Sequence, residues 1–228
     1  MKKLTVIIPA YNEDPNNVQV MIDYFGSAGI ETLIIDDGSP EPIENQDYKS
    51  ARVIRRALNS GYGSAIKYGI SQATGDYIAI IDADLQYDPD ELMSMWEMVT
   101  DEDMVIGRRI THQGGWRRFL GRMFIKTVAS IVAMRYIPDL NSGSRIFKKS
   151  VAKSYLSLLC DEFSFTTSLT MCMVLEHWKV KWLPIGFYPR NGSRSTVKMI
   201  RHGLITLFQI IYITIGIRTR RLRKWLRK

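Results

Sequence analysis

Short apolar runs rich in β-branched residues alternate with segments of helical periodicity through the first half of the chain. Strands are expected at residues 4–8, 32–36, 52–55, 77–82 and 103–106. Helices are expected over residues 16–28 and 63–73, with a further helix starting at 88–91. Such alternation is typical of βαβ units, which build a largely parallel sheet covered by helices. The sequence therefore predicts an α/β fold, and the lack of an internal repeat favours one domain.

Polar side chains follow four of these strands at the point where each strand ends. The four segments are Tyr11-Asn12-Glu13, Asp36-Asp37-Gly38-Ser39, Asp82-Ala83-Asp84 and Gly107-Arg108-Arg109. In open parallel sheets, ligands bind beyond the carboxyl ends of the strands. Three of the four ends contain acids, and clustered negative charge costs stability unless a cation or hydrogen-bond donors compensate it. A ligand site is therefore expected at this edge of the sheet.

Asp82 and Asp84 are the most informative acids. Residues two apart in a strand point to the same face, so both carboxylates can approach one site, with Gln86 nearby. Oxygen ligands suit Mg²⁺ or Mn²⁺, ions that keep bound waters and bridge substrate phosphates. The alternative is that Asp84 and Asp88 only cap a turn or a helix. Their place after an apolar strand in a βα series favours the metal site.

Two further segments have both a functional and a plain structural interpretation. One acid of Asp36-Asp37-Gly38-Ser39 could accept hydrogen bonds from a base or a ribose, or the segment is an ordinary Asp-Gly turn. The glycines of Asn59-Ser60-Gly61-Tyr62-Gly63 allow close backbone approach to a ligand. That segment lacks the full dinucleotide-binding signature, and alone it indicates a loop and a helix start.

The net charge of +8 is concentrated at the carboxyl end. Seven basic residues and no acid lie within 218–228, and the rest of the chain is almost neutral. A basic nucleic-acid-binding surface is therefore not expected. The amino terminus lacks the apolar stretch and cleavage site of a signal peptide, and Cys160 and Cys172 have no metal or redox spacing. These features indicate a cytosolic protein.

The last thirty residues combine an apolar helical pattern with the basic tail. The run from Leu204 to Ile217 is too short to span a bilayer, which needs roughly 20 residues. An apolar helix followed by basic residues suits an interfacial anchor on an anionic membrane. The alternative is a helix packed on the domain or on an oligomer partner. Segment 114–137, where aromatic and aliphatic residues interleave with basic ones, is a second candidate for membrane contact.

Taken in order, these segments resemble the family 2 glycosyltransferases of GT-A fold. The matching segments are 6–13, similar to the opening strand, 36–39, similar to the nucleotide-binding acid pair, and 59–69, similar to the glycine-containing helix start. Asp82-Ala83-Asp84-Leu85-Gln86-Tyr87-Asp88-Pro89 is the most specific match, and it resembles the polyprenyl-phosphate branch, which includes dolichyl-phosphate mannose synthases. Segments 139–145 and 189–195 are similar to two later elements of that branch. Ser144, where an aromatic residue is usual, and Lys126, near a usual small polar residue, depart from the pattern.

The resemblance implies a role for each matching residue. The metal ligands would be Asp82, Asp84 and Gln86. The nucleotide-sugar would contact Pro9, Tyr11, Glu13, Asp37, Gly63, Asp82, Arg190 and Ser193. The acceptor phosphate would contact Arg109, Arg122, Lys126 and Arg145, and the catalytic set would be Asp84, Asp139, Arg109 and Arg122.

The expected protein is an enzyme with a GT-A domain over 1–198 and an amphipathic helix with a basic tail over 199–228. With Mg²⁺ or Mn²⁺, it would transfer a sugar with inversion from a UDP- or GDP-sugar to a polyprenyl phosphate. It would do so as a peripheral protein at the inner, cytoplasmic face of an anionic membrane, without nucleic acid. A membrane-protein partner or a homo-oligomer is a further possibility. The alternatives are transfer to a glycan or a lipid-linked oligosaccharide, and a non-catalytic protein that binds nucleotide sugars.

Overall fold

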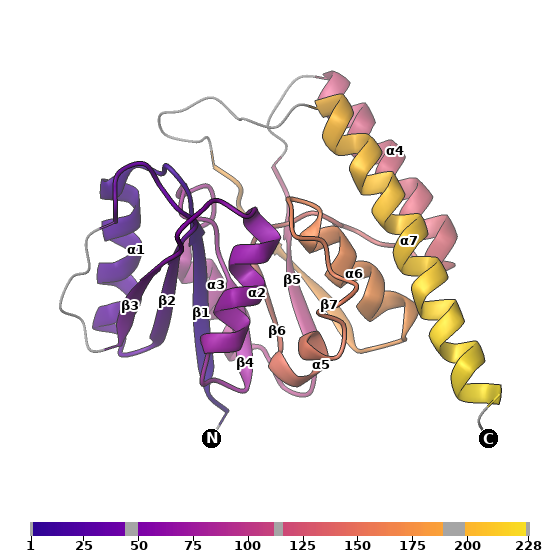
Figure 1. The fold of residues 1–228 in the computed structure, drawn as a ribbon, viewed down its shortest axis with the longest axis horizontal. Coiled ribbons are helices and arrows are strands. Elements are labelled where there is room, and N and C mark those ends of the chain that lie inside the picture. Colours follow the sequence, from indigo (N-terminus) through magenta and orange to yellow (C-terminus); the bar gives the residue numbers. More distant parts are fainter. Residues whose placement is uncertain (1, 44–49, 112–115, 189–198, 227–228) are drawn as a thin grey trace.

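A computed structural model describes residues 2–43, 50–111, 116–188 and 199–226. Within these ranges the chain forms a seven-stranded sheet that runs through the centre of the molecule (Figure 1). Its strands are β1 (Leu4–Ala10), β2 (Glu31–Asp36), β3 (Ala51–Arg55), β4 (Tyr77–Ile80), β5 (Met104–Arg109), β6 (Arg145–Lys148) and β7 (Val180–Ile185).

The sheet is mostly parallel, as the sequence predicts. Its strand order is β3-β2-β1-β4-β6-β5-β7. Only β6 runs antiparallel to its neighbours β4 and β5 among the described strands. In β1, Ile7 pairs with Leu33 of β2 on one side and with Ile80 of β4 on the other. The carboxyl ends of β1, β2 and β4 therefore meet at one edge.

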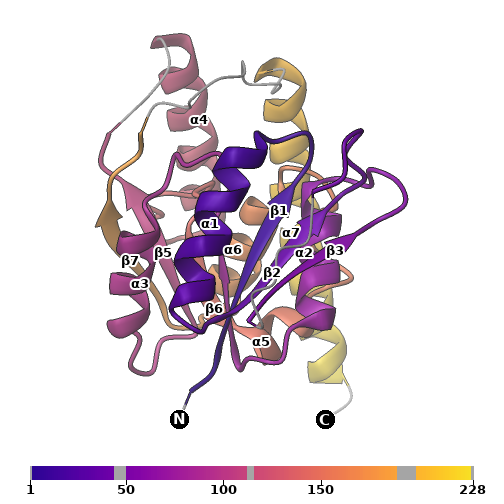
Figure 2. The same ribbon diagram turned by 90° about the vertical axis from the view of Figure 1, so that its left-hand side faces the viewer.

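Helices cover both faces of the sheet (Figures 1 and 2). The described helices are α1 (Pro15–Ser27), α2 (Tyr62–Gln72), α3 (Pro89–Glu97), α4 (Trp116–Ala133), α5 (Lys149–Lys153), α6 (Phe165–Leu175) and α7 (Met199–Leu226). One core cluster unites α1 and α3 with one sheet face, and the other unites α2, α5 and α6 with the opposite face. The two faces alternate along each strand: Ile7 belongs to the second cluster, whereas Val6 and Ile8 belong to the first.

Local sequence signals set the helix boundaries. The side chain of Asp14 accepts a 2.9 Å hydrogen bond from the backbone N–H of Asn16, and Pro15 follows as the first helical residue of α1. Asp88 and Pro89 start α3 in the same way. The expected strands and helices of the first half are confirmed with boundaries that differ by at most two residues, except that β5 ends three residues later than expected. The sequence did not predict β6, β7 or α6.

Helices α4 and α7 lie side by side outside α6 (Figure 1). Three buried isoleucines of α7, Ile210, Ile213 and Ile217, join the core cluster beneath it. Both helices nevertheless expose large apolar side chains to solvent, namely Trp116, Phe119, Leu120, Met123, Phe124 and Ile131 of α4, and Leu204, Phe208, Ile211, Tyr212, Ile215 and Leu222 of α7. We call these residues the α4–α7 apolar surface.

The helix that contains the apolar run 204–217 is longer than the run itself. In the described part of the chain, one stretch of 22 residues, Arg201–Leu222, is long and apolar enough to cross a membrane by length and composition alone. The expectation that this segment is too short to span a bilayer is therefore wrong in length, because the helix continues through polar residues at each end of the apolar run.

Candidate functional site

A cavity of about 520 Å³ opens beyond the carboxyl ends of β1, β2 and β4. The residues that line it are Pro9, Ala10, Tyr11, Asn12, Glu13, Asp37, Asn59, Gly61, Tyr62, Ala65, Asp82, Ala83, Asp84, Asn141, Gly143, Glu162, Phe163 and Thr166. Five of these described residues are acids and none is a lysine or an arginine. We call this space the acidic cavity.

Asp82 and Asp84 lie together in the acidic cavity, as predicted. The Tyr62 hydroxyl donates a 2.8 Å hydrogen bond to Oδ1 of Asp82. Burial, followed by the neighbouring Asp84 carboxylate, raises the pKa of Asp82 from 3.8 to about 7. Both carboxylates therefore carry full charge at neutral pH only at a cost, which a bound cation would remove. This electrostatic imbalance fits a divalent cation.

Gly143 brings the loop before β6 against the metal-site pair. A Cβ atom at this position would lie 2.1 Å from Oδ2 of Asp82. The Gly143 backbone N–H donates a 2.9 Å hydrogen bond to the Tyr87 hydroxyl, which holds the loop in place. The glycine of the 139–145 motif is therefore explained by close approach of backbone to carboxylate.

The side chain of Gln86, the third predicted metal ligand, contacts the segment that follows β7, and its role as a ligand stays a prediction. Its side-chain Nε2 donates a 3.1 Å hydrogen bond to the Tyr188 carbonyl oxygen, and Gln86 does not line the acidic cavity. Leu85, with a φ of 56°, turns the chain at this point. No group of three or more His, Cys, Asp and Glu side chains placed for a metal occurs in the described ranges. The chain thus offers two carboxylates, and Mg²⁺ or Mn²⁺ ordinarily completes its coordination with waters and substrate phosphates.

The predicted nucleoside contacts Pro9, Tyr11, Glu13 and Asp37 also line the acidic cavity. Oδ2 of Asp37 accepts hydrogen bonds from the backbone N–H groups of Ser60 (3.0 Å) and Gly61 (2.8 Å). Its Oδ1 forms a 2.6 Å ion pair with Arg56. Asp37 therefore fixes the turn that precedes α2, in addition to facing the cavity.

Gly63 serves packing rather than ligand contact, which corrects the prediction for this residue. A Cβ at Gly63 would lie 2.1 Å from the Cys160 carbonyl oxygen and 2.8 Å from Cβ of Phe165. Gly61, two residues earlier, lines the cavity instead and has a φ of 100°, which favours glycine.

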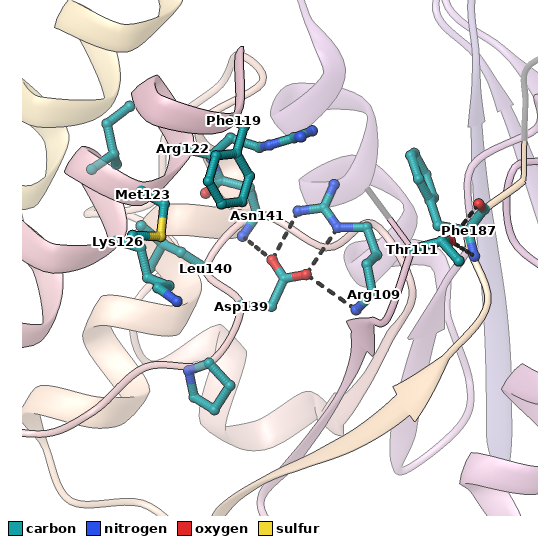
Figure 3. A pocket seen from close by; sticks show the side chains of 12 residues that line it. Arg109, Thr111, Phe119, Arg122, Met123, Lys126, Asp139, Leu140, Asn141 and Phe187 are labelled. Atoms are coloured by element: carbon teal, nitrogen blue, oxygen red, sulfur yellow. Dashed lines mark hydrogen bonds and ion pairs between the residues drawn. The ribbon is translucent and has the colours of Figure 1, made fainter. Parts of the chain in front are cut away.

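A second, smaller cavity of about 90 Å³ lies between the end of β5, helix α4 and the loop before β6 (Figure 3). Its lining residues are Arg109, Thr111, Phe119, Arg122, Met123, Ile125, Lys126, Pro138, Asp139, Leu140, Asn141 and Phe187. We call it the basic cavity. The structure thus brings together four residues predicted for the acceptor and catalytic sites, namely Arg109, Arg122, Lys126 and Asp139.

Arg109 and Asp139 form a buried bidentate ion pair. Arg109 Nε donates to Asp139 Oδ2 at 2.9 Å, and its Nη2 donates to Oδ1 at 2.8 Å (Figure 3). Burial alone would raise the pKa of Asp139, but the Arg109 guanidinium lowers it below its ordinary value. Phe187 packs over the guanidinium with 5.3 Å between the Arg109 Cζ and the ring centroid. Asp139 is therefore a stable anion that orients Arg109, and a poor proton acceptor.

The structure contradicts the acceptor-phosphate assignment of Arg145. This side chain is fully buried. It donates from Nε to the Ser142 carbonyl oxygen at 3.0 Å, and from Nη1 to the Thr166 carbonyl oxygen at 2.9 Å and to Thr170 Oγ1 at 3.1 Å. Arg145 therefore ties the loop before β6 to α6 and lines neither cavity. The two remaining predicted site residues, Arg190 and Ser193, lie outside the described residues.

Sequence reasoning missed two residues of the site. Tyr62 belongs to the glycine-containing segment that was examined, but nothing in the pattern indicates its bond to Asp82. Asn141 lies inside the 139–145 motif and lines both cavities, so the two cavities adjoin at this residue. The sequence did offer one signal for Asn141: it is an amide side chain that lies between the charged residues Asp139 and Arg145 of the motif.

Residues 5–156 match the family model described as glycosyl transferase family 2. The chain belongs to this family. A curated relative, the dolichol-phosphate mannosyltransferase of Pyrococcus furiosus, is 28% identical over 214 residues, which cover 86% of this chain and 59% of that protein. The family 2 chain therefore spans about three-fifths of that relative's length.

Solved structures are similar in fold to this family 2 chain. Glucosyl-3-phosphoglycerate synthase of Mycobacterium tuberculosis with phosphoglyceric acid gives a TM-score of 0.73 at 16% identity, covering 93% of this chain and 80% of that one. The same synthase with Mn²⁺, UDP-glucose and phosphoglyceric acid gives a TM-score of 0.71, again at 16% identity, with the same shares of both chains covered. The mostly parallel sheet flanked by helices is therefore of the GT-A type.

Replacing Asp82 with Asn should raise the melting temperature of the metal-free protein at pH 8, because it removes one of two crowded charges. The pKa of Asp82 is raised in the folded state, so protonation of this carboxylate favours folding. Its contribution to the free energy of unfolding therefore falls as the pH rises from 3.8 to about 7. The gain in melting temperature from Asp82→Asn should thus be smaller at pH 5 than at pH 8. Thermal melts in EDTA at pH 8 and at pH 5 measure this difference in melting temperature, and Glu97→Gln, at an exposed position, is the control.

When Mn²⁺ replaces EDTA in the melts, it should stabilise the wild type but not Asp82→Asn. Equal stabilisation of both proteins by Mn²⁺, or a variant that melts below the wild type at pH 8 in EDTA, would contradict the assignment of Asp82.

Proposed function

We propose that this protein catalyses metal-dependent, inverting transfer of a sugar from a nucleoside-diphosphate sugar to a polyprenyl phosphate of the dolichyl or undecaprenyl type. The observation that best supports this is the pair of adjoining cavities, one acidic and one basic. A cation-bound diphosphate suits the first, and a phosphate with an apolar chain suits the second. Because Asn141 lines both, donor and acceptor would meet beside it.

The donor would occupy the acidic cavity. Asp82 and Asp84 would hold Mg²⁺ or Mn²⁺, which neutralises the charge that grows on the departing diphosphate. Pro9, Tyr11, Glu13 and Asp37 would surround the nucleoside, of UDP or of GDP. From the family resemblance, Arg190 and Ser193 would contact the diphosphate.

The acceptor phosphate would occupy the basic cavity. Arg122 and Lys126 of α4 line this space, and Arg109, which is held by Asp139, lines it as well (Figure 3). The lining residues Phe119 and Met123 also belong to the α4–α7 apolar surface, and this shared membership suits a lipid chain. These charges bind and orient a phosphate monoester.

The proposed reaction is a single in-line displacement. An oxygen of the acceptor phosphate forms a bond to the anomeric carbon while the bond from that carbon to the diphosphate breaks, and the electron pair leaves with the diphosphate. The second pKa of a phosphate monoester is about 6, so the acceptor is already largely anionic at neutral pH. Positioning by arginines therefore matters more than deprotonation, in agreement with an Asp139 committed to Arg109.

The curated relative from Pyrococcus furiosus supports a lipid-phosphate acceptor, since it is named a dolichol-phosphate mannosyltransferase. The synthase structures with Mn²⁺ and UDP-glucose support a divalent ion with a nucleotide sugar in a chain of this fold. An experiment that varies both substrates separates the proposal from a glycan acceptor and from binding without turnover.

The direct test is a panel of UDP- and GDP-sugars with Mg²⁺ or Mn²⁺ and three acceptors: farnesyl phosphate, phosphoglyceric acid and an oligosaccharide. Transfer to farnesyl phosphate is expected, with an acid-labile product whose anomeric configuration is opposite to that of the donor. Asp84→Ala should abolish turnover, because it removes one of two carboxylates for the metal.

Transfer only to the oligosaccharide, or metal-dependent nucleotide binding without turnover on any acceptor, would contradict the proposal. A product that keeps the donor's configuration would contradict the single displacement. Glu97→Gln, at an exposed position of α3, is the matched acid control and should keep wild-type activity.

We also propose that residues 1–198 form the catalytic domain and that residues 199–228 attach it to the inner, cytoplasmic face of a membrane as a peripheral protein. The α4–α7 apolar surface supports this, and so do the seven basic residues of 218–228. Anionic lipids attract such residues by about 1 kcal/mol each near the surface. If lipid does not bind, a membrane-protein partner or a second copy of the chain would cover the α4–α7 apolar surface.

Deleting residues 218–228 should weaken flotation of the protein with anionic liposomes, because the electrostatic attraction is lost. Phe208→Glu, on the exposed face of α7, should weaken it as well, whereas Val20→Glu on α1 should not. Flotation that is unchanged by the deletion would contradict the role of the tail, and flotation unchanged by Phe208→Glu would contradict that of the apolar surface.

A further inference from the structure

Asn141 differs from every other residue of its motif in exposure. The other six residues of segment 139–145 are buried, whereas Asn141 is exposed. Its exposed surface faces the acidic cavity on one side and the basic cavity on the other. The exposed polar side chain of Asn141, at the junction of the two cavities, can therefore contact a ligand bound in either of them.

Neighbouring groups fix the orientation of the Asn141 amide. The hydroxyl of Thr167, a fully buried residue in the first turn of α6, donates a hydrogen bond to Asn141 Oδ1. The backbone N–H of Asn141 donates a 3.2 Å hydrogen bond to Asp139 Oδ1. Because the side-chain oxygen is engaged by Thr167, the amide has two N–H donors left to offer.

We infer that Asn141 is a phosphate-binding residue whose side-chain NH₂ donates to a phosphate oxygen where donor and acceptor meet. This inference rests on the proposed function. A fixed donor at the place where charge shifts during transfer stabilises that charge without reorganising. A neutral amide suits the position: a carboxylate would repel phosphate, and a cation would pair with the nearby Asp82 or Asp139 carboxylates.

The bond between Asn141 and Thr167 could also serve only to tie the loop to α6, and substitutions separate the two roles. Asn141→Asp keeps an oxygen for the Thr167 hydroxyl but loses the NH₂ donor. Asn141→Ala loses both. Thr167→Val removes the group that orients the amide, and Thr167→Ser retains the hydroxyl as a matched control.

The experiment measures kcat and KM of the full chain with farnesyl phosphate and the sugar donor that the wild type uses, together with melting temperatures. Asn141→Asp and Asn141→Ala should lower kcat/KM by about 10²-fold, the usual effect of removing one such donor. Asn141→Asp should have the same melting temperature as the wild type. Thr167→Val should show a smaller loss of activity, and Thr167→Ser should stay near the wild type.

Binding measurements identify the phosphate that is contacted. A raised KM for farnesyl phosphate with unchanged Mn²⁺-dependent binding of nucleoside diphosphate assigns the contact to the acceptor. Weakened binding of the nucleoside diphosphate assigns it to the donor. Wild-type kcat/KM in Asn141→Asp, or losses that only follow the melting temperature, would overturn the inference.

Failure of the proposed function is recognisable separately, because the wild type itself would then transfer no sugar to farnesyl phosphate. In that case calorimetric titration with inorganic phosphate in the presence of Mn²⁺ and nucleoside diphosphate still tests Asn141. Weaker binding of inorganic phosphate or of the nucleoside diphosphate by Asn141→Asp than by the wild type supports the inference, and equal binding of both overturns it.

Discussion

The buried guanidinium of Arg145 is the interaction on which the arrangement of both cavities depends. It binds the carbonyl oxygens of Ser142 and Thr166, and so fixes the loop before β6 against the start of α6. That loop supplies Asp139 and Asn141, together with the backbone of Gly143 beside Asp82. Burying a charge this completely is costly unless every donor finds a partner. Each of the three guanidinium nitrogens of Arg145 donates to at least one oxygen, which offsets this cost and fixes the loop against α6.

Charge is distributed unequally between the two cavities, and this asymmetry follows from the topology. Parallel strands β1, β2 and β4 deliver acids to one edge, which creates the acidic cavity. The end of β5 delivers Arg109, and α4 adds Arg122 and Lys126 on the far side of the loop. The ion pair of Arg109 with Asp139 lies within the basic cavity, and the two cavities adjoin at Asn141. A cation-bound diphosphate and a phosphate monoester could therefore bind side by side.

The sequence predicted the fold and the place of the site well, because both follow from periodicity. Alternating apolar runs indicate strands, and parallel strands bring their carboxyl ends together, so Asp37, Asp82 and Asp84 could be placed in one cavity. The antiparallel β6 was missed because its four residues, Arg-Ile-Phe-Lys, contain only two apolar side chains between two basic ones and so give no strand pattern. The basic cavity was predicted in part, since Arg109, Arg122 and Lys126 do converge.

Three predicted site residues make other contacts in the structure for one physical reason: a motif gives the type of a side chain but not its direction. Gln86 follows a left-handed residue and turns to Tyr188. Gly63 is small because Cys160 and Phe165 press against it. Arg145 resembles a phosphate ligand in sequence, yet it lies in the buried strand β6, where both Arg145 and Phe147 are fully buried. Only tertiary packing distinguishes these cases.

The central claim is that Asp82 and Asp84 hold a divalent cation against a diphosphate in the acidic cavity. Anomalous scattering from a crystal grown with Mn²⁺ and a nucleoside diphosphate tests it most directly. One strong Mn²⁺ peak is expected, in contact with both carboxylates and with the diphosphate oxygens. A Mn²⁺ peak elsewhere, or a nucleotide bound outside the acidic cavity, would contradict it.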